Sequence, residues 1–124
     1  MLLAAKATDP IERIKNLLTF IIGGLSYNFL LWKNKVPLNS YSGETFQATK
    51  DGVDLYIELT NFNPPIYHYY LKEQSGLFEL FGYETTVMEM DGINHAIGKI
   101  EGRSVIKYKD GSMTSLVFPT LYFH

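Results

Sequence analysis

The stretch "YIELTNFNPPIYHYY", Tyr56 to Tyr70, contains two consecutive prolines between runs of β-branched and aromatic residues. Such runs are typical of β-strands. Neither Pro64 nor Pro65 can donate a hydrogen bond to a strand ladder, and each moves the residue before it away from the helical conformation. The pair therefore predicts a stiff corner that joins two strands.

The alternation on the N-terminal side of this corner indicates a sheet with one covered face. In "VDLYIEL" one face carries only apolar residues and the other is mostly polar, and "RSVIKY" (103–108) alternates more weakly. Further turn signals separate runs rich in Val, Ile, Thr, Tyr and Phe; they are "KDG" (50–52), "EQSG" (73–76), "DG" (91–92), "EG" (101–102) and "KDG" (109–111). This spacing predicts an antiparallel meander over about 45–124.

The N-terminal part instead has helical spacing, in "TDPIERIKNLLTFIIGG" (8–24). Asp9 suits an N-cap, Pro10 suits the first helical position, and Glu12 completes a capping box. The apolar residues that recur at helical spacing are Ile11, Ile14, Leu17, Leu18, Ile21 and Ile22. Because glycine commonly ends helices, Gly23 or Gly24 is expected to end an amphipathic helix over about 9–23. A crossing loop follows over about 33–44.

Composition narrows the classes of function. A formal charge of −2 gives no long-range attraction to nucleic acid, and the lack of cysteine excludes disulfides and thiolate metal sites. The stretch 16–32 carries no charge over 17 residues, at the lower limit for a bilayer span, but Gly23, Gly24 and polar residues interrupt it. We therefore expect no transmembrane span.

Catalytic chemistry has no support in the sequence. His68, His95 and His124 are too scattered for a metal site, and no nucleophile elbow, phosphate loop or dinucleotide-binding motif is present. Glu44 and Glu58 fit a turn and a solvent-facing strand position better than a catalytic carboxylate pair. A non-enzymatic protein without cofactor or metal is expected.

Four segments, in order, resemble the lipid-binding domain of the oxysterol-binding protein-related family. "TDPIERIKNLLTFIIGGL" resembles the family's Asp-Pro-x-Glu-Arg helix, and "VPLNSYSGETFQ" (36–47) its Lys-Pro-Phe/Leu-Asn-Pro-x-Leu-Gly-Glu-x-Phe motif. "ELTNFNPPIYHYYL" (58–71) is similar to the signature Glu-Gln-Val-Ser-His-His-Pro-Pro-Ile, and "GKIEGRSVIKYKDG" (98–111) to a later glycine-containing segment.

The resemblance implies an α+β fold in which an N-terminal amphipathic helix packs on a curved antiparallel β-sheet, a partial oxysterol-binding-type barrel. It places the Pro-Pro corner at the mouth of a lipid tunnel, after two histidines that hold a phosphoinositide phosphate. Here those two positions are Phe62 and Asn63, and the motif lysine is Val36. Neutral groups cannot supply charge-assisted bonds to a phosphate dianion, so phosphoinositide exchange is not expected.

Two hypotheses follow for 1–124, taken as a single truncated domain of this type. In the first, it binds a sterol or other hydrophobic lipid, including phospholipid. In the second, it is a degenerate family member that serves as a structural subunit, with protein partners covering an open sheet edge. Peripheral membrane contact fits either hypothesis. The lipid-binding residues are expected to be Leu38, Asn39, Glu44, Phe62, Asn63, Pro64, Pro65, Tyr67 and Tyr69.

Overall fold

The computed structural model describes residues 1–30, 40–90, 92, 96–118 and 121–123. The chain divides into two compact units, Met1–Asn39 and Ser40–His124. The first unit is helical and the second is a β-sheet, so the α+β class predicted from the sequence is confirmed.

The helical unit contains α1 (Leu2–Lys6) and α2 (Pro10–Leu30). The predicted start of the long helix is correct: the Asp9 carboxylate accepts a hydrogen bond from the Glu12 N–H at 3.0 Å. The Glu12 carboxylate pairs with Lys15 at 3.0 Å. The Arg13 guanidinium donates two hydrogen bonds to the Ala7 carbonyl, at 3.2 and 2.7 Å, and so ties α2 to the end of α1.

The prediction that Gly23 or Gly24 ends this helix is wrong, because α2 continues to Leu30. A glycine ends a helix when it takes a left-handed conformation, and neither of these glycines has a positive φ. Nothing lies within 4 Å of a Cβ placed at either glycine. The two glycines are therefore ordinary helical positions that lower the stability of the helix.

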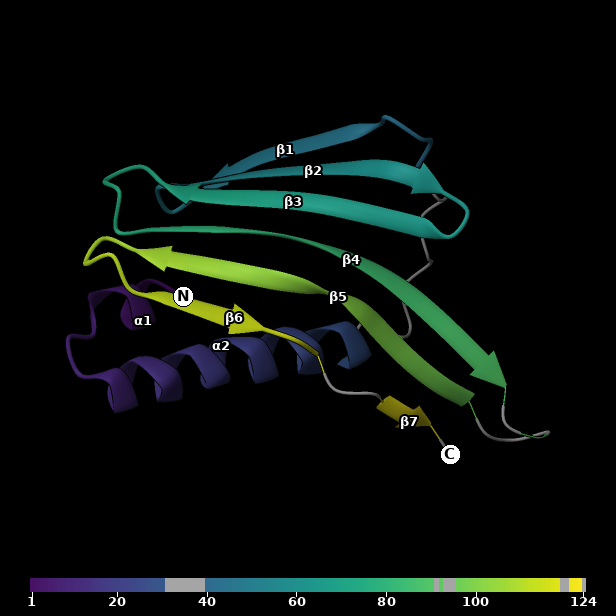
Figure 1. Cartoon of the computed structure of the whole chain (residues 1–124), viewed down its shortest axis with the longest axis horizontal. Helices are drawn as coiled ribbons and strands as arrows, with labels where there is room; N and C mark the ends of the chain where they lie inside the picture. The colour runs from purple at the N-terminus through teal and green to yellow at the C-terminus, as the bar shows by residue number, and fades with distance from the viewer. Residues whose placement is uncertain (31–39, 91, 93–95, 119–120, 124) are drawn as a thin grey trace. The chain divides into compact units, whose positions relative to one another are not determined.

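In the described residues of the second unit, seven strands form an antiparallel sheet, and from β1 to β6 neighbours in sequence are neighbours in space (Figure 1). The order is β1-β2-β3-β4-β5-β6, and β7 pairs with the opposite end of β5 from β6. Its strands are β1 (Thr45–Lys50), β2 (Val53–Phe62), β3 (Pro65–Glu73), β4 (Phe78–Met90), β5 (Ala96–Tyr108), β6 (Met113–Leu116) and β7 (Leu121–Phe123).

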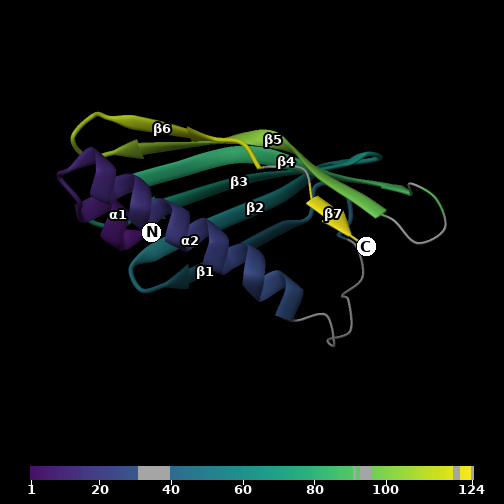
Figure 2. The ribbon, with the colours of Figure 1, turned by 90° about the horizontal axis from the view of Figure 1, so that it is seen from below.

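The sheet is curved and does not close into a barrel. Figure 2 shows the strands rotating progressively from β1 to β6, as the right-handed strand twist requires. Within the described residues, β1 pairs only with β2, and β6 pairs only with β5. The partial barrel inferred from the resemblance is confirmed, and each of these two strands presents one edge without a strand partner.

Most predicted turns connect strands, and one does not. Asp51 and Gly52, both at positive φ, form the tight turn between β1 and β2. The Glu73 carboxylate accepts the Leu77 N–H at 3.0 Å in the next connection, which leads into β4. The predicted "EG" turn at Glu101–Gly102 is wrong, because both residues lie inside β5.

Gly102 is in that strand for a steric reason. Its φ is +140°, and a Cβ there would overlap the Tyr83 carbonyl of β4. The glycine thus permits a close approach between two long strands. Glycine is also the residue typical of turns, so the sequence alone does not distinguish the two roles. The predicted turn at 91–92 includes Asp91, which lies outside the described residues.

Strand register separates two faces of the sheet. The Leu59 face carries Leu59 and the other inward residues of "VDLYIEL", and it includes the buried Phe78, Leu80 and Ile106. The Tyr70 face carries the alternate residues, beginning with the pair Tyr56 and Tyr70. The alternation predicted from the sequence is therefore present, and the apolar core of the sheet lies on the Leu59 face.

Replacing Gly24 with alanine is expected to raise the free energy of unfolding by about 0.5–1 kcal/mol, because alanine loses less backbone entropy in a helix. Denaturant unfolding followed by circular dichroism measures this change. The matched control is Gly102→Ala, which should lower stability because of its backbone overlap. A destabilised Gly24→Ala variant would show that Gly24 does not occupy an ordinary helical position.

Candidate functional site

The Pro-Pro corner is the hairpin turn between β2 and β3. Phe62 pairs with Pro65, and Asn63 and Pro64 form the turn between them. The Phe62 side chain is 57% exposed, and the other three residues are exposed as well. The corner predicted from the sequence is confirmed, and it presents an aromatic ring and a neutral amide to solvent.

The carboxylate and the N–H of Glu44 are both hydrogen-bonded within a local turn. Its carboxylate accepts the Tyr41 N–H at 2.8 Å, and its own N–H donates to the Tyr41 carbonyl at 2.9 Å. The Gly43 N–H donates to the Leu59 carbonyl at 2.7 Å, which fastens this turn to β2. Glu44 therefore orders the entry into β1. Leu38 and Asn39, predicted beside it, lie outside the described residues.

Tyr67 and Tyr69 lie on the Leu59 face of β3. Tyr69 is in register with Gly82 of β4, which is in register with Ser104 of β5. The Tyr69 hydroxyl and the buried Ser104 Oγ are hydrogen-bonded at 2.5 Å. Because Gly82 has no side chain, the tyrosine reaches across the whole width of β4 to this partner.

Glu84 lies beside these residues, in register with Tyr67 on one side and Gly102 on the other. Burial raises the pKa of the Glu84 carboxyl. Burial also raises the pKa of Tyr69; the hydrogen bond from Ser104 opposes this shift and the Glu84 charge adds to it. We call Tyr67, Tyr69, Glu84 and Ser104 the Tyr69 cluster, a polar group on the sheet face that carries the apolar core.

Two members of the Tyr69 cluster, Glu84 and Ser104, were missed in the sequence. The alternation of β4 assigns Glu84 to the same face as the buried Leu80, and a carboxyl at such a position is a signal of function. Ser104 likewise shares the parity of the buried Ile106 in "RSVIKY". Both signals depend on knowing that these segments are strands with one covered face.

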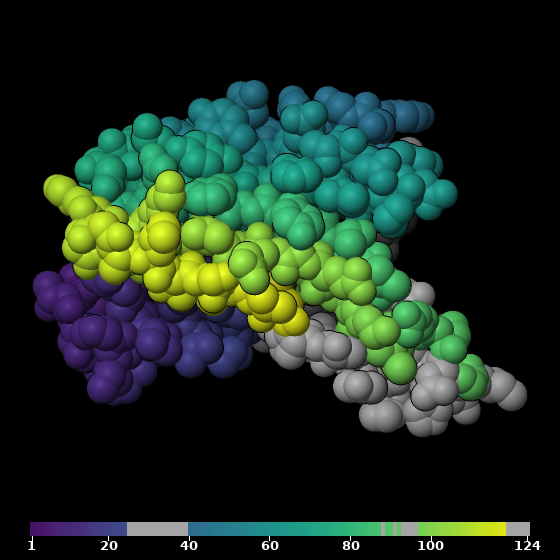
Figure 3. All heavy atoms as spheres, viewed as in Figure 1, coloured from purple at the N-terminus to yellow at the C-terminus, as the bar shows by residue number. Residues whose placement is uncertain are grey.

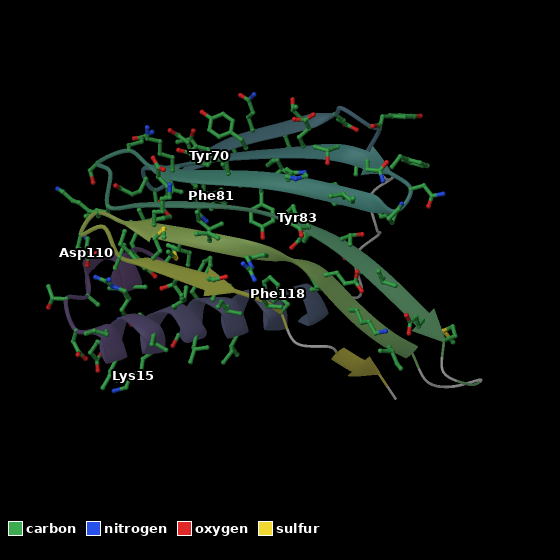
Figure 4. All side chains as sticks on the ribbon, in the orientation of Figure 1. Lys15, Tyr70, Phe81, Tyr83, Asp110 and Phe118 are labelled. Carbon is green, nitrogen blue, oxygen red and sulfur yellow. The ribbon has the colours of Figure 1, made fainter. Side chains whose placement is uncertain are left out.

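The Tyr70 face holds an open groove of about 520 Å³. Tyr70, Phe81 and Tyr83 lie together on the side of the sheet that faces the viewer in Figure 4, and Tyr56 and His68 also line the groove. The Tyr56 and Tyr70 rings are 6.3 Å apart, and those of His68 and Tyr83 are 5.6 Å apart. By strand register the side chains of these five residues belong to the opposite face from the Tyr69 cluster, and Tyr69 itself also lines the groove.

In the part of the chain that the structure describes, no three His, Asp or Glu side chains are grouped so that they could hold a metal ion. Within the same residues, no helix has both the length and the apolar composition that a bilayer crossing needs.

Comparison with known proteins agrees with the geometry. Over 117 residues, 94% of this chain, the sequence is 31% identical to oxysterol-binding protein 9 of Dictyostelium discoideum. The resemblance to the lipid-binding domain of the oxysterol-binding protein-related family is confirmed. The chain spans 26% of the length of that relative, and no protein-family model matches it.

A solved structure has the same fold as this chain. The crystal structure of the Osh1 ORD domain in complex with ergosterol matches 96% of the chain with a TM-score of 0.77, at 19% sequence identity. The match covers 29% of the Osh1 chain. The sheet described above therefore corresponds to one part of a larger oxysterol-binding-type fold.

Replacing Glu84 with glutamine is expected to make stability less dependent on pH. Folding raises the pKa of this carboxyl, so its protonated form contributes to the free energy of unfolding at pH values below its pKa in the unfolded chain. That contribution is lost as the pH rises through the pKa of the folded state. The amide of the substituted glutamine stays neutral throughout. Unfolding at pH 4 and pH 7 should therefore show that E84Q gains stability over the wild type at pH 7 only.

The control for this comparison is Glu58→Gln, which removes an exposed carboxylate from the opposite face. Because this side chain is exposed, the variant tests the loss of one negative charge without a change in the Tyr69 cluster. Equal pH profiles for E84Q and the wild type would contradict a buried environment for Glu84.

Proposed function

We propose that this chain forms part of a non-enzymatic binding site for a sterol or another hydrophobic lipid. The observation that carries the proposal is the 31% identity to an oxysterol-binding protein over 94% of the chain. The fold shared with a domain whose crystal structure contains ergosterol supports the same ligand class.

The Leu59 face offers the chemistry that a sterol needs. A sterol is a rigid apolar body with one hydroxyl, so its site requires apolar surface and a small number of polar partners. The apolar surface would come from the partly exposed side chains of this face, such as Leu55, Ile57 and Leu71. The Tyr69 cluster supplies hydroxyl groups, and the Glu84 carboxyl, with its raised pKa, can donate as well as accept a hydrogen bond when protonated.

We assign the entrance of this site to the Pro-Pro corner. Its exposed residues Phe62, Asn63, Pro64 and Pro65, together with Glu44, form the proposed rim, and Tyr67 and Tyr69 lead inward. Two features make phosphoinositide an unsuitable ligand. Phe62 and Asn63 carry no charge, and the Glu44 carboxylate, already bonded to Tyr41, is itself an anion.

A structural role is the second candidate, and the open sheet supports it. Along β1 every residue is exposed, so its free edge can accept a strand from a protein partner. Neutral residues at Phe62 and Asn63 fit a family member that has lost headgroup exchange. Peripheral contact with a membrane surface is compatible with either role.

Native mass spectrometry of the purified chain, followed by organic extraction, separates the two roles. A stoichiometric sterol or phospholipid is expected for a lipid-binding chain. An empty chain that is stable only in complex with other proteins would overturn lipid binding and leave the structural role.

A titration with a fluorescent sterol then tests the assigned residues. Tyr69→Phe removes the hydroxyl that bonds Ser104 and should weaken sterol binding about tenfold, the effect of one hydrogen bond to a buried partner. The matched control Tyr83→Phe removes a hydroxyl from the opposite face of the sheet and should bind as the wild type does. Equal losses in the two variants would contradict a site on the Leu59 face.

A further inference from the structure

The Tyr70 face has an ordered pattern that lipid binding on the other face does not use. Register places twelve side chains of β2, β3, β4 and β5 in three rows that run across the strands, and we call this area the striped face. The rows are Asp54-Lys72-Glu79-Lys107, Tyr56-Tyr70-Phe81-Val105 and Glu58-His68-Tyr83-Arg103.

The striped face is accessible in its polar rows and partly accessible in its aromatic row. Glu58, His68, Lys72, Arg103 and Lys107 are exposed. Tyr56 is 44% exposed and Tyr83 is 46% exposed. In Figure 3 the side chains of these strands form one continuous surface towards the viewer. Contacts already link the rows, since the Lys107 ammonium lies 5.3 Å from the centre of the Phe81 ring.

The charges of the striped face argue against an anionic partner. Its acidic residues are Asp54, Glu58 and Glu79, and its basic residues are Lys72, Arg103 and Lys107. Three negative and three positive charges cancel, so the face has no net attraction for nucleic acid or an anionic membrane. A partner must instead match the order of the charges.

The charges of the striped face are arranged so that a second copy, rotated by a two-fold axis, places opposite charges against them. The first row reads negative, positive, negative, positive from β2 to β5, so the same row read backwards has the opposite sign at each position. A two-fold axis that runs along the strands between β3 and β4 produces this reversal. It places β2 of one copy over β5 of the other.

That rotation pairs every row with itself. Asp54 meets Lys107 of the second copy, Lys72 meets Glu79, and Glu58 meets Arg103. In the central row Tyr70 meets Phe81, which places aromatic surface between the two charged rows. Each unlike pair occurs twice, as in any isologous interface.

We propose that the striped face is a self-association surface, whose partner is the striped face of a second copy of this chain. Four strands about 4.8 Å apart and three rows about 7 Å apart cover roughly 400 Å² per copy, about half the area that a standard stable interface buries on each partner. The dimer is therefore weak and sensitive to salt. It is independent of the lipid site, which lies on the opposite face.

Complementary charge variants test this surface. Glu58→Arg opposes two arginines across the axis, and Arg103→Glu opposes two glutamates, so each variant alone should dimerise about tenfold or more weakly than the wild type. An equimolar mixture should recover dimers, because the introduced arginine of one variant then faces the introduced glutamate of the other. Within one chain these positions lie three strand spacings apart, about 14 Å, so no contact inside the chain explains such a recovery.

Sedimentation equilibrium of the full chain between about 10 µM and 1 mM measures the association. The control Lys50→Glu changes the net charge by the same amount as Arg103→Glu, at an exposed position outside the rows. It should dimerise as the wild type does. The double variant E58R/R103E, which restores the complement within each chain, should also dimerise.

The wild type provides a test that needs no substitution. Its dimer should weaken as sodium chloride rises from 50 to 500 mM, since ion pairs at an exposed interface are screened. A wild type that stays monomeric to 1 mM overturns the proposal. Recovery that fails in the mixture of two folded variants also overturns it.

Discussion

The hydrogen-bonded register across β2, β3, β4 and β5 is the constraint on which the rest of the sheet depends. Side chains alternate between the faces of a strand, so a slip of one residue would exchange the two faces. The Pro-Pro corner fixes this register between β2 and β3, and the turn held by the Glu73 carboxylate fixes it between β3 and β4. Both the apolar Leu59 face and the striped Tyr70 face follow from that single alignment.

Glycines inside the strands leave room for polar side chains of neighbouring strands to come together in the Tyr69 cluster. Tyr69 reaches Ser104 only because Gly82 stands between them without a side chain. Gly102 removes a second side chain beside Glu84, where β4 and β5 approach too closely for a Cβ. Glycine inside a strand lowers the stability of the sheet, because it loses more backbone entropy on folding and has no side chain to pack. The contacts of the Tyr69 cluster and the close approach of β4 and β5 offset this loss.

The chain resembles the oxysterol-binding proteins in its fold and differs from the family's motif at the residues before the two prolines. The fold is shared with the Osh1 ORD domain, and the helix start at Asp9 and the corner at Pro64–Pro65 lie in the segments whose sequence resembles the family. The resemblance implies histidines at the two positions before the prolines, where this chain has the neutral residues Phe62 and Asn63. These neutral residues agree with the proposed ligand class, which is recognised by apolar contact and a few hydrogen bonds.

The sequence by itself determined the elements whose causes are local: the Asp9 cap, the alternation of 53–59, the Asp51–Gly52 turn and the proline corner. It misjudged Gly23, Gly24 and Gly102, because a glycine can end a helix, occupy one or permit two strands to approach. Tertiary structure alone decided that Tyr69 meets Ser104, 35 residues away in the chain, and that Glu84 lies beside them. Contacts of that kind depend on strand register, which no local pattern of residues specifies.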